Sequence, residues 1–244
     1  MPIFKKILSW SSGKDAAYTL HRFIKQNMKP DLLLTTVNKD YERVSMHGLR
    51  VSLLEQQAKA LNIPLYTIPL SKDVDMATYN DTMYKHLNIL KEQGFDTVIY
   101  GDILLEDLKT YREKQMAKVN MKPEFPIWKR NTKQLARDII NSGIKALIVS
   151  TNAKLLDQSF VGRPYDKAFL NDIPENVDWC GENGEFHTFV YDSPDFNRPI
   201  PYRLGFKTFK EYKPCSKKDQ ENYNKSVKKS NWDTGFWYID VLPA

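Results

Sequence analysis

The sequence predicts an α/β fold with a doubly wound parallel sheet and a smaller C-terminal region of mixed α+β structure. Over the first 150 residues, short apolar runs alternate with segments of helical period, as in βαβ units. After about residue 152 the chain turns to loops rich in Pro, Asp and Asn and to runs typical of antiparallel strands. We therefore expect one domain at 1–125 and a second at 126–244, with a soft boundary because residues 121–143 fit either part.

Five nearly continuous apolar runs are the expected strands of the parallel sheet, because strands that are covered on both faces are apolar on both faces. These runs span 5–10, 31–37, 65–70, 97–102 and 145–150. Further strands are expected in the second region at 185–192, 199–206 and 235–244. The second region should therefore be mainly antiparallel.

Apolar residues recur at helical spacing between the first five runs, and each set defines one helix face. The sets are Ala17, Leu20 and Ile24; Leu54, Ala58 and Leu61; Met83, Leu87 and Leu90; and Leu135 with Ile139. Ser52 and Glu55 have the spacing of a capping box, while Gly94 and Gly143 stand where helices should end. Right-handed crossovers should connect the parallel strands.

Composition excludes several classes of protein. No apolar run approaches the roughly 18 residues that a membrane span requires. The apolar N-terminal stretch breaks at 11–15, too early for a signal peptide, so a cytoplasmic location is expected. Cys180 and Cys215 lack CxxC spacing, and neither a zinc knuckle nor a disulfide framework is predicted.

The net charge of +6 is concentrated in one segment. Residues 207–229 hold eight lysines against three acids and few aliphatic residues, so we expect 207–231 to form an exposed lysine-rich loop. An arm that contacts RNA is the alternative, but aromatic stacking platforms are sparse there. Nucleic acid and membranes are therefore not expected as partners.

A turn of small residues, within SWSSGKDAAYTL at 9–20, joins the first expected strand to the first expected helix. Such a turn leaves backbone N–H groups unpaired, and these groups together with the helix dipole favour a phosphate. Lys14 would add a positive charge. Leu8 and Asp15 stand where a Walker A motif needs Gly and Ser or Thr, and the chain has no GxGxxG. The two commonest nucleotide motifs are thus excluded.

The segment SSGKDA resembles the pyrophosphate-binding loop, S-G-G-x-D-S/T, of the adenine nucleotide α-hydrolase or PP-loop ATP pyrophosphatase superfamily. The resemblance implies a sheet order of 3-2-1-4-5, with the fourth strand beside the first. It implies ATP binding by Ser11, Ser12, Gly13, Lys14, Asp15, Gly101 and Asp102. Lys14, Asp15 and Asp102 are the expected catalytic residues, and both aspartates are expected to bind Mg²⁺. A helix cap is the alternative role for Asp102.

Three further stretches, at 101–113, 156–163 and 180–190, look like segments of the diphthine–ammonia ligase (diphthamide synthetase) family, especially its shorter bacterial relatives. The family implies that a carboxylate attacks the α-phosphorus of ATP, pyrophosphate leaves, and ammonia displaces AMP to give an amide. The expected partners are ATP, ammonia and an unidentified carboxylate acceptor, either a small molecule or a protein side chain. A homodimer is the further partner expected.

The stretch CGENGEFHTFV at 180–190 contains the acceptor-binding candidates of the second region. Glu182 and Glu185 could hold an ammonium group, an acceptor cation or a metal, and Asn183 could bond a carboxylate. Two glycines would let this loop approach a ligand closely. A turn with solvated acids is the alternative.

Four other residues are weaker candidates. Arg112 and Arg163 are assigned to the acceptor, with a solvated helix face and an ion pair to Asp166 as the respective alternatives. His47 is assigned to the nucleotide, with a loop histidine without a role as the alternative. Cys180 lacks an obvious activating base and is expected to be an inert thiol.

Two positions of the loop depart from the superfamily pattern, since Ser12 replaces Gly and Ala16 replaces Ser. If position 12 requires a positive φ, its serine carries strain of about 1 kcal/mol or more. An AMP-forming ligase is the first hypothesis, and a nucleotide-binding or sensing protein with weak or no turnover is the second. An RNA-modifying PP-loop ATP pyrophosphatase is the third, against which stand the localised charge and the lack of a second cysteine near Cys180.

Overall fold

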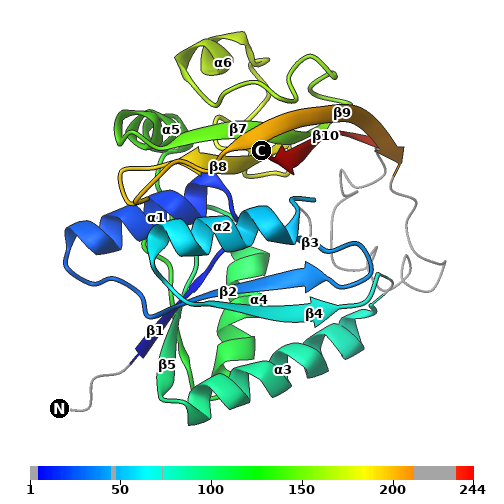
Figure 1. The fold of residues 1–244 in the computed structure, drawn as a ribbon. Coiled ribbons are helices and arrows are strands. Elements are labelled where there is room, and N and C mark those ends of the chain that lie inside the picture. Colours follow the sequence, from blue (N-terminus) through cyan, green and yellow to red (C-terminus); the bar gives the residue numbers. More distant parts are fainter. Residues whose placement is uncertain (1–4, 45–47, 73, 212–234) are drawn as a thin grey trace.

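The computed structural model describes residues 5–44, 48–72, 74–211 and 235–244, which form two sheets and their helices (Figure 1). Sheet A contains β1 (Lys5–Ser9), β2 (Leu32–Asn38), β3 (Arg43–Val44), β4 (Leu65–Leu70), β5 (Phe95–Ile99) and β6 (Lys122–Glu124). Sheet B contains β7 (Lys145–Asn152), β8 (Phe186–Asp192), β9 (Tyr202–Glu211) and β10 (Gly235–Pro243). The helices are α1 (Lys14–Lys25), α2 (Val51–Leu61), α3 (Met76–Glu92), α4 (Glu106–Lys118), α5 (Thr132–Asn141) and α6 (Lys167–Asp172).

Sheet A has the strand order β4-β2-β1-β5-β6 with parallel pairs throughout, and the short β3 adds to β2 antiparallel. Numbered along the chain, the parallel strands follow the order 3-2-1-4-5, which confirms the predicted fold class. One strand assignment was wrong, because the fifth parallel strand is β6 and residues 145–150 belong to β7 of the antiparallel sheet B. A three-residue strand that contains Pro123 has almost no sequence signal.

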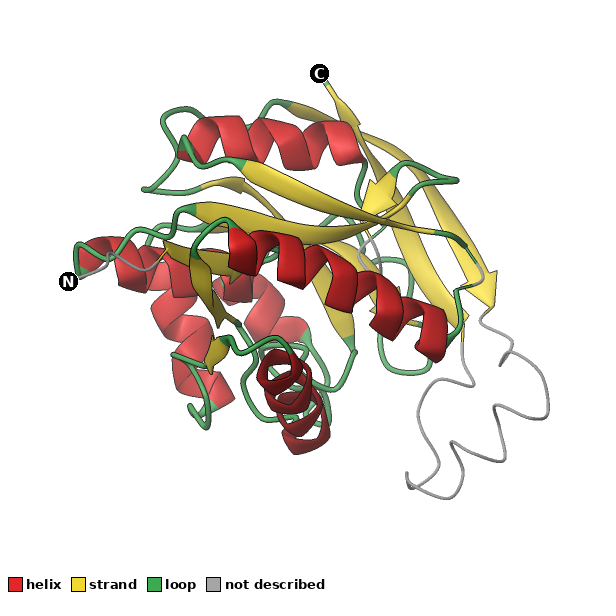
Figure 2. Cartoon of the chain, turned by 90° about the horizontal axis from the view of Figure 1, so that it is seen from below, coloured by secondary structure: helices red, strands yellow, loops and turns green. Residues whose placement is uncertain are grey.

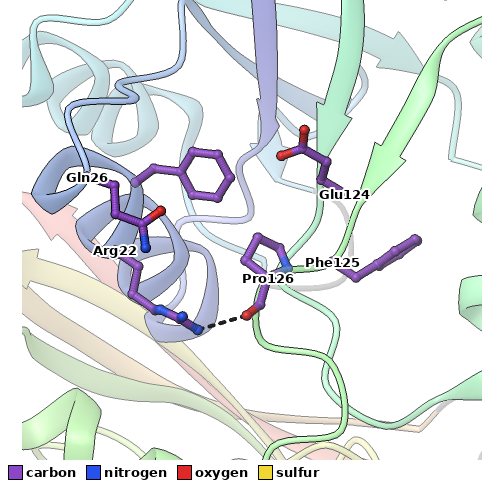
Figure 3. Close-up of a pocket in the computed structure, with 6 residues that line it drawn as sticks. Arg22, Gln26, Glu124, Phe125 and Pro126 are labelled. Carbon is purple, nitrogen blue, oxygen red and sulfur yellow. Dashed lines mark hydrogen bonds between the residues drawn. The ribbon is translucent and has the colours of Figure 1, made fainter.

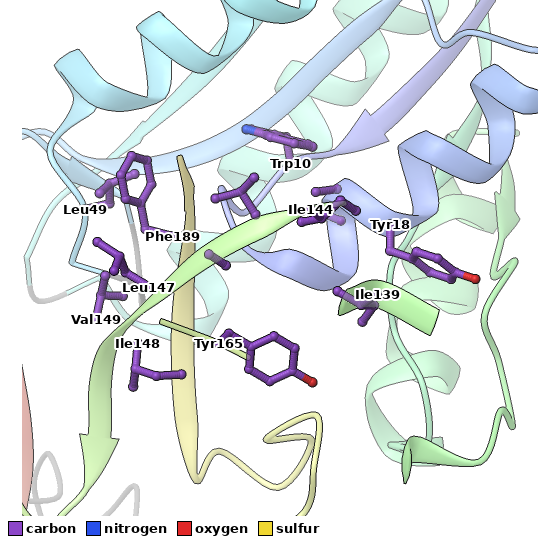
Figure 4. Close-up of a cluster of buried hydrophobic side chains, with 14 of the residues drawn as sticks. Trp10, Tyr18, Leu49, Ile139, Ile144, Leu147, Ile148, Val149, Tyr165 and Phe189 are labelled. Atoms are coloured by element: carbon purple, nitrogen blue, oxygen red, sulfur yellow. The ribbon is translucent and has the colours of Figure 1, made fainter. Parts of the chain in front are cut away.

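The two sheets share a layer of helices. Helices α1 and α2 lie between sheet A and sheet B, while α3 and α4 cover the opposite face of sheet A (Figure 1). The same elements are seen from below in Figure 2. Buried side chains such as Trp10, Leu147 and Phe189 belong to one apolar cluster that joins sheet A, the shared helices and sheet B (Figure 4). The β1–α1 turn is therefore enclosed between the sheets.

The structure bears on the predicted helix ends, the capping box and the lysine-rich loop. Gly94 and Gly143 directly follow the C-caps of α3 and α5 with φ of 91° and 88°, which confirms them as helix stops. The capping box was wrong, because α2 begins at Val51 after Arg50 and Ser52 lies inside the first turn. The loop expected at 207–231 begins as strand, since 207–211 belong to β9, and its remainder lies outside the described residues.

Among the described residues, no helix is both long enough and apolar enough to cross a membrane.

Candidate active site

The turn between β1 and α1 has a strained backbone at Ser12. Ser12 is fully buried and has φ of 72°, and Gly13 then caps α1 with an extended backbone. A left-handed conformation costs a residue other than glycine about 1–2 kcal/mol. Because φ of Ser12 is positive, the backbone strain that the sequence predicts for a positive φ at this position is present.

Lys14 connects this turn to the second region. Its ammonium group donates to the backbone carbonyl of Cys180 at 2.5 Å and to Asp15 Oδ2 at 2.9 Å. The same nitrogen lies 5.3 Å and 5.2 Å from the ring centres of Tyr165 and Phe186. Burial alone would lower the pKa of Lys14, but the Asp15 carboxylate raises this pKa overall, so the amine is a cation. The ammonium group of Lys14, which was expected to lie beside the phosphates, instead donates to the backbone carbonyl of Cys180.

Two side-chain oxygens of the turn are buried without a hydrogen-bond partner, namely Ser12 Oγ and Asp15 Oδ1. Burial raises the pKa of Asp15, although Lys14 opposes the shift. Unpaired buried polar atoms cost free energy, and a ligand or metal ion that binds them would remove this cost. A carboxylate oxygen is also a ligand that Mg²⁺ prefers. The turn thus fits a phosphate with its metal ion.

The end of β5 lies directly against this turn. A Cβ at Gly101 would stand 3.1 Å from the backbone carbon of Asp15 and 3.2 Å from the nitrogen of Ala16, so a larger residue would force the two segments apart. The strand order that the sequence resemblance implied places β5 beside β1, which agrees with this contact. Gly101 and the turn are therefore brought together.

Asp102 is directed toward Arg112 of α4. Arg112 Nε lies 2.5 Å from Asp102 Oδ2, and its guanidinium stacks 4.2 Å from the ring centre of Tyr100. Burial raises the pKa of Asp102, and Arg112 opposes this shift. The alternative role as a helix cap was wrong, because α4 is capped at Leu105. The Asp102 carboxylate is thus paired with the guanidinium of Arg112.

Glu182 joins the second region to the turn that follows β5. Its Oε1 accepts from the backbone N–H groups of Ile103, Leu104 and Leu105 at 3.1, 2.7 and 3.4 Å. Burial raises the pKa of Glu182, and the bond from Leu104 opposes the shift. Glu182 is thus held close to Gly101 and the phosphate turn.

Glu185 and Asn183 satisfy each other inside their own loop. The Glu185 carboxylate is 2% exposed and accepts from the Asp178 backbone at 3.1 Å. It also accepts from the Asn183 backbone at 2.8 Å and from the Asn183 side chain at 2.9 Å. The alternative of a turn with solvated acids is therefore wrong for Glu185, which organises the loop from within.

The remaining candidates are Arg163, Cys180 and His47. Arg163 pairs with Asp172 at 2.6 Å, so the alternative of a pair with Asp166 was wrong, and Asp166 instead caps α6. Cys180 is buried, its Sγ donates to the Thr132 carbonyl at 3.3 Å, and burial raises the pKa of the thiol far above its ordinary value, which agrees with an inert thiol. His47 lies outside the described residues.

Comparison with known families places these loops in a known context. The model of the diphthamide synthase N-terminal domain matches residues 4–123, and that of the diphthamide synthase C-terminal domain matches residues 131–215. The chain belongs to the diphthamide synthase family. The N-terminal match includes the phosphate turn and Gly101, and the C-terminal match includes Glu182 and Glu185.

Individual relatives agree with this assignment. Diphthine–ammonia ligases of Bos taurus and Homo sapiens are 28% and 27% identical over 219 residues, which cover 78% of this chain and 79% of each relative. The Saccharomyces cerevisiae diphthine–ammonia ligase is 24% identical over 254 residues, 89% of this chain and 36% of that protein. A predicted subunit of tRNA methyltransferase from Methanocaldococcus jannaschii aligns with a TM-score of 0.44 and 16% identity over 81% of this chain and 100% of that one. The sequence relatives support an ATP-dependent amide ligase.

Two polar residues that contact the phosphate turn, Thr188 and Gln57, were not predicted from the sequence. Thr188 Oγ1 accepts from the backbone N–H of Lys14 at 3.0 Å, and Gln57 donates to the Ser12 carbonyl at 3.2 Å. Strand alternation from Phe186 offered a signal for Thr188, because alternate residues share a face. Gln57 stands out only as a polar residue between Leu54 and Leu61 on an apolar helix face.

A pocket of about 330 Å³ lies elsewhere in the molecule (Figure 3). Arg22 borders it and donates to the Pro126 carbonyl at 2.8 Å. Its lining residues are Arg22, Phe23, Gln26, Glu124, Phe125 and Pro126. None of them belongs to the phosphate turn or to the loop at 180–185, so we do not assign this pocket to the site.

Proposed function

We propose that the protein activates a carboxylate acceptor with ATP by adenylation and transfers the acyl group to ammonia, giving an amide, AMP and pyrophosphate. The observation that carries this proposal is the pair of unpartnered buried oxygens, Ser12 Oγ and Asp15 Oδ1, at the N-terminus of α1. Their place beside Gly101, in a chain of the diphthamide synthase family, fits a nucleotide phosphate.

The proposed nucleotide site uses backbone groups and one free carboxylate oxygen. Backbone N–H groups at 11–13 and 15 and the α1 dipole would bind the pyrophosphate, while the N–H of Lys14 donates to Thr188, and Asp15 Oδ1 would hold Mg²⁺. Bound Mg²⁺ would neutralise charge on the phosphates. Lys14 positions the turn through its bond to residue 180, and His47 remains our candidate contact to the nucleotide.

The proposed acceptor site lies between the β5–α4 turn and the loop at 180–185. Glu182 borders it from the second region, and Arg112 lies on α4 behind Asp102. Glu185 and Asn183 support this border through their mutual bonds, and Arg163 stays a more distant candidate. The named relatives act on diphthine, and we propose an acceptor that likewise carries a carboxylate, as a small molecule or a protein side chain.

We further propose that the division at 1–125 and 126–244 separates nucleotide binding from acceptor binding. The reaction would take place in the cytoplasm. A homodimer remains part of this proposal.

The experiment is an incubation with Mg-ATP, ammonium and candidate carboxylates, followed by phosphorus NMR and chromatography of the nucleotides. We expect AMP and pyrophosphate in equal amounts, with their release dependent on the acceptor. Asp15→Asn protein is the matched control, because it keeps the shape of the turn. Release of ADP, or no nucleotide binding by calorimetry, would overturn the proposal.

A nucleotide-binding protein with weak turnover is the second candidate function. The observation that favours it is the Lys14 amine, which is bonded to the Cys180 carbonyl and to Asp15. Tight ATP binding without pyrophosphate release, whichever acceptor is added, would support this candidate over the ligase.

A further inference from the structure

We propose that Gln57 is a positioning residue that holds Ser12 of the phosphate turn in its left-handed conformation. This inference rests on the proposed nucleotide site and adds a residue on α2, a helix that none of the quoted motifs includes. Gln57 substitutes in part for the glycine that the superfamily loop has at position 12.

The Gln57 side chain is fully buried and bonds three separate segments. Its Nε2 donates to the carbonyl of Ser12 at 3.2 Å and to the carbonyl of Val190 at 2.6 Å. Its Oε1 accepts from Trp10 Nε1 at 3.0 Å. The amide is therefore used at both ends, and α2 is tied to the end of β1, the turn and β8.

These bonds fix the peptide unit that follows Ser12. The Ser12 carbonyl accepts both from Gln57 and from the Val190 backbone, the latter at 2.9 Å. In a trans peptide, the C=O and the next N–H point in opposite directions. Anchoring the Ser12 carbonyl toward α2 and β8 therefore aims the N–H of Gly13 the other way, toward Ser11 Oγ, to which it donates at 3.4 Å. Gln57 thus sets the direction of a group that we assign to phosphate binding.

Removing the donor should release the strain at Ser12 and misplace this N–H. Gln57→Met keeps the length of the side chain and loses both donated bonds and the bond accepted from Trp10. Because left-handed strain corresponds to about a tenfold change in population, we expect ATP to bind about tenfold more weakly. Glycine adopts this conformation without strain, so Ser12→Gly in the Gln57→Met background should restore affinity to within about twofold of Ser12→Gly alone.

Leu54→Ala is the matched control, because Leu54 is equally buried on the same helix and does not bond the turn. Leu54→Ala should lower the melting temperature, while its ATP affinity stays within about twofold of wild type. Adding Ser12→Gly to Leu54→Ala should not change this affinity further. A loss of affinity in Leu54→Ala as large as in Gln57→Met, or no rescue by Ser12→Gly, would overturn the proposal.

A melting-temperature cycle without nucleotide separates this inference from the proposed function. Ser12→Gly should raise the melting temperature more in the wild-type background, where Ser12 is strained, than in Gln57→Met, where Ser12 has relaxed. An equal increase in both backgrounds would contradict the role of Gln57. Gln57→Asn, whose amide is one methylene shorter, should give the same pattern with smaller amplitude if Gln57→Met does not fold. Absence of ATP binding by the wild type would contradict the proposed function and leave this cycle as the test.

Discussion

The turn at 11–15 and the loop at 180–185 meet through Lys14, yet they satisfy their polar groups differently. The first leaves Ser12 Oγ and Asp15 Oδ1 without partners and depends on α2 and β8 for support. The second is closed on itself, with Glu185 accepting three hydrogen bonds from Asp178 and Asn183. A loop rich in acids can thus be a scaffold, whereas the turn keeps two buried oxygens that the proposed phosphate site would use.

Asp15→Asn should have the largest effect and tests the first loop. Asparagine keeps the oxygen that accepts from Lys14 and removes the negative charge that we assign to Mg²⁺. We expect pyrophosphate release to fall by about a hundredfold or more, and the melting temperature to fall as well because Lys14 loses its buried counter-charge. Asp107→Asn, at an exposed acid of α4, is the control and should retain full activity. Equal activity of Asp15→Asn and wild type would remove the distinction between the loops.

Glu185→Ala should act mainly on stability and tests the second loop. Without the carboxylate, two backbone N–H groups and one side-chain amide lose a buried acceptor, at roughly 1–3 kcal/mol for each group that stays unsatisfied. We expect the free energy of unfolding, measured with urea, to fall by about 2–4 kcal/mol. Glu175→Ala, at an exposed acid nearby, should change it by less than about 0.5 kcal/mol. A small stability loss with a large loss of ATP binding would instead place Glu185 at the ligand.

The fold was largely predictable because burial leaves a periodic signal. Apolar runs located four of the five parallel strands and, near Phe186, Tyr202 and Gly235, three of the four strands of sheet B. The prediction failed where the signal is local and weak, as in β6 with its Pro123. It also failed where one pattern fits two environments, because β7 is as apolar as a parallel strand although it lies in an antiparallel sheet.

The site was predictable as a set of segments and not as a set of contacts. Motifs indicated the turn, Gly101 and Glu182, which do meet. Sequence separation hides which side chain satisfies which atom, so the inward direction of Lys14 had no signal. Gln57 illustrates the same limit, since its partners lie 45 and 133 residues away along the chain.

Glu182→Gln should produce a smaller, pH-dependent effect at the contact between the loop at 180–185 and the turn that follows β5. Burial raises the pKa of Glu182 above its ordinary 4.5, so the folded protein keeps this proton to a higher pH than the unfolded chain does. The stability contributed by the proton is complete below pH 4.5 and is lost as pH rises through the raised pKa. Glutamine has no such loss.

Urea unfolding from about pH 4 to about pH 7 should therefore show the difference between variant and wild type shifting in favour of Glu182→Gln. Glu175→Gln, at an exposed acid, is the control for the removal of a surface charge. A constant difference for Glu182→Gln, or a shift toward the wild type, would contradict the raised pKa.

Cys180→Ala should have the smallest effect, because Lys14 bonds the backbone carbonyl of Cys180 and not its sulfur. We expect ATP turnover within about twofold of wild type and a stability loss of about 1 kcal/mol from the lost sulfur contacts. Since the thiolate is the reactive form and burial raises the pKa of this thiol, iodoacetamide should modify Cys180 in urea and not in the native protein. Peptide mass spectrometry reads out both states. Rapid native alkylation that abolishes turnover would show that the sulfur, rather than the carbonyl beside it, connects the two loops.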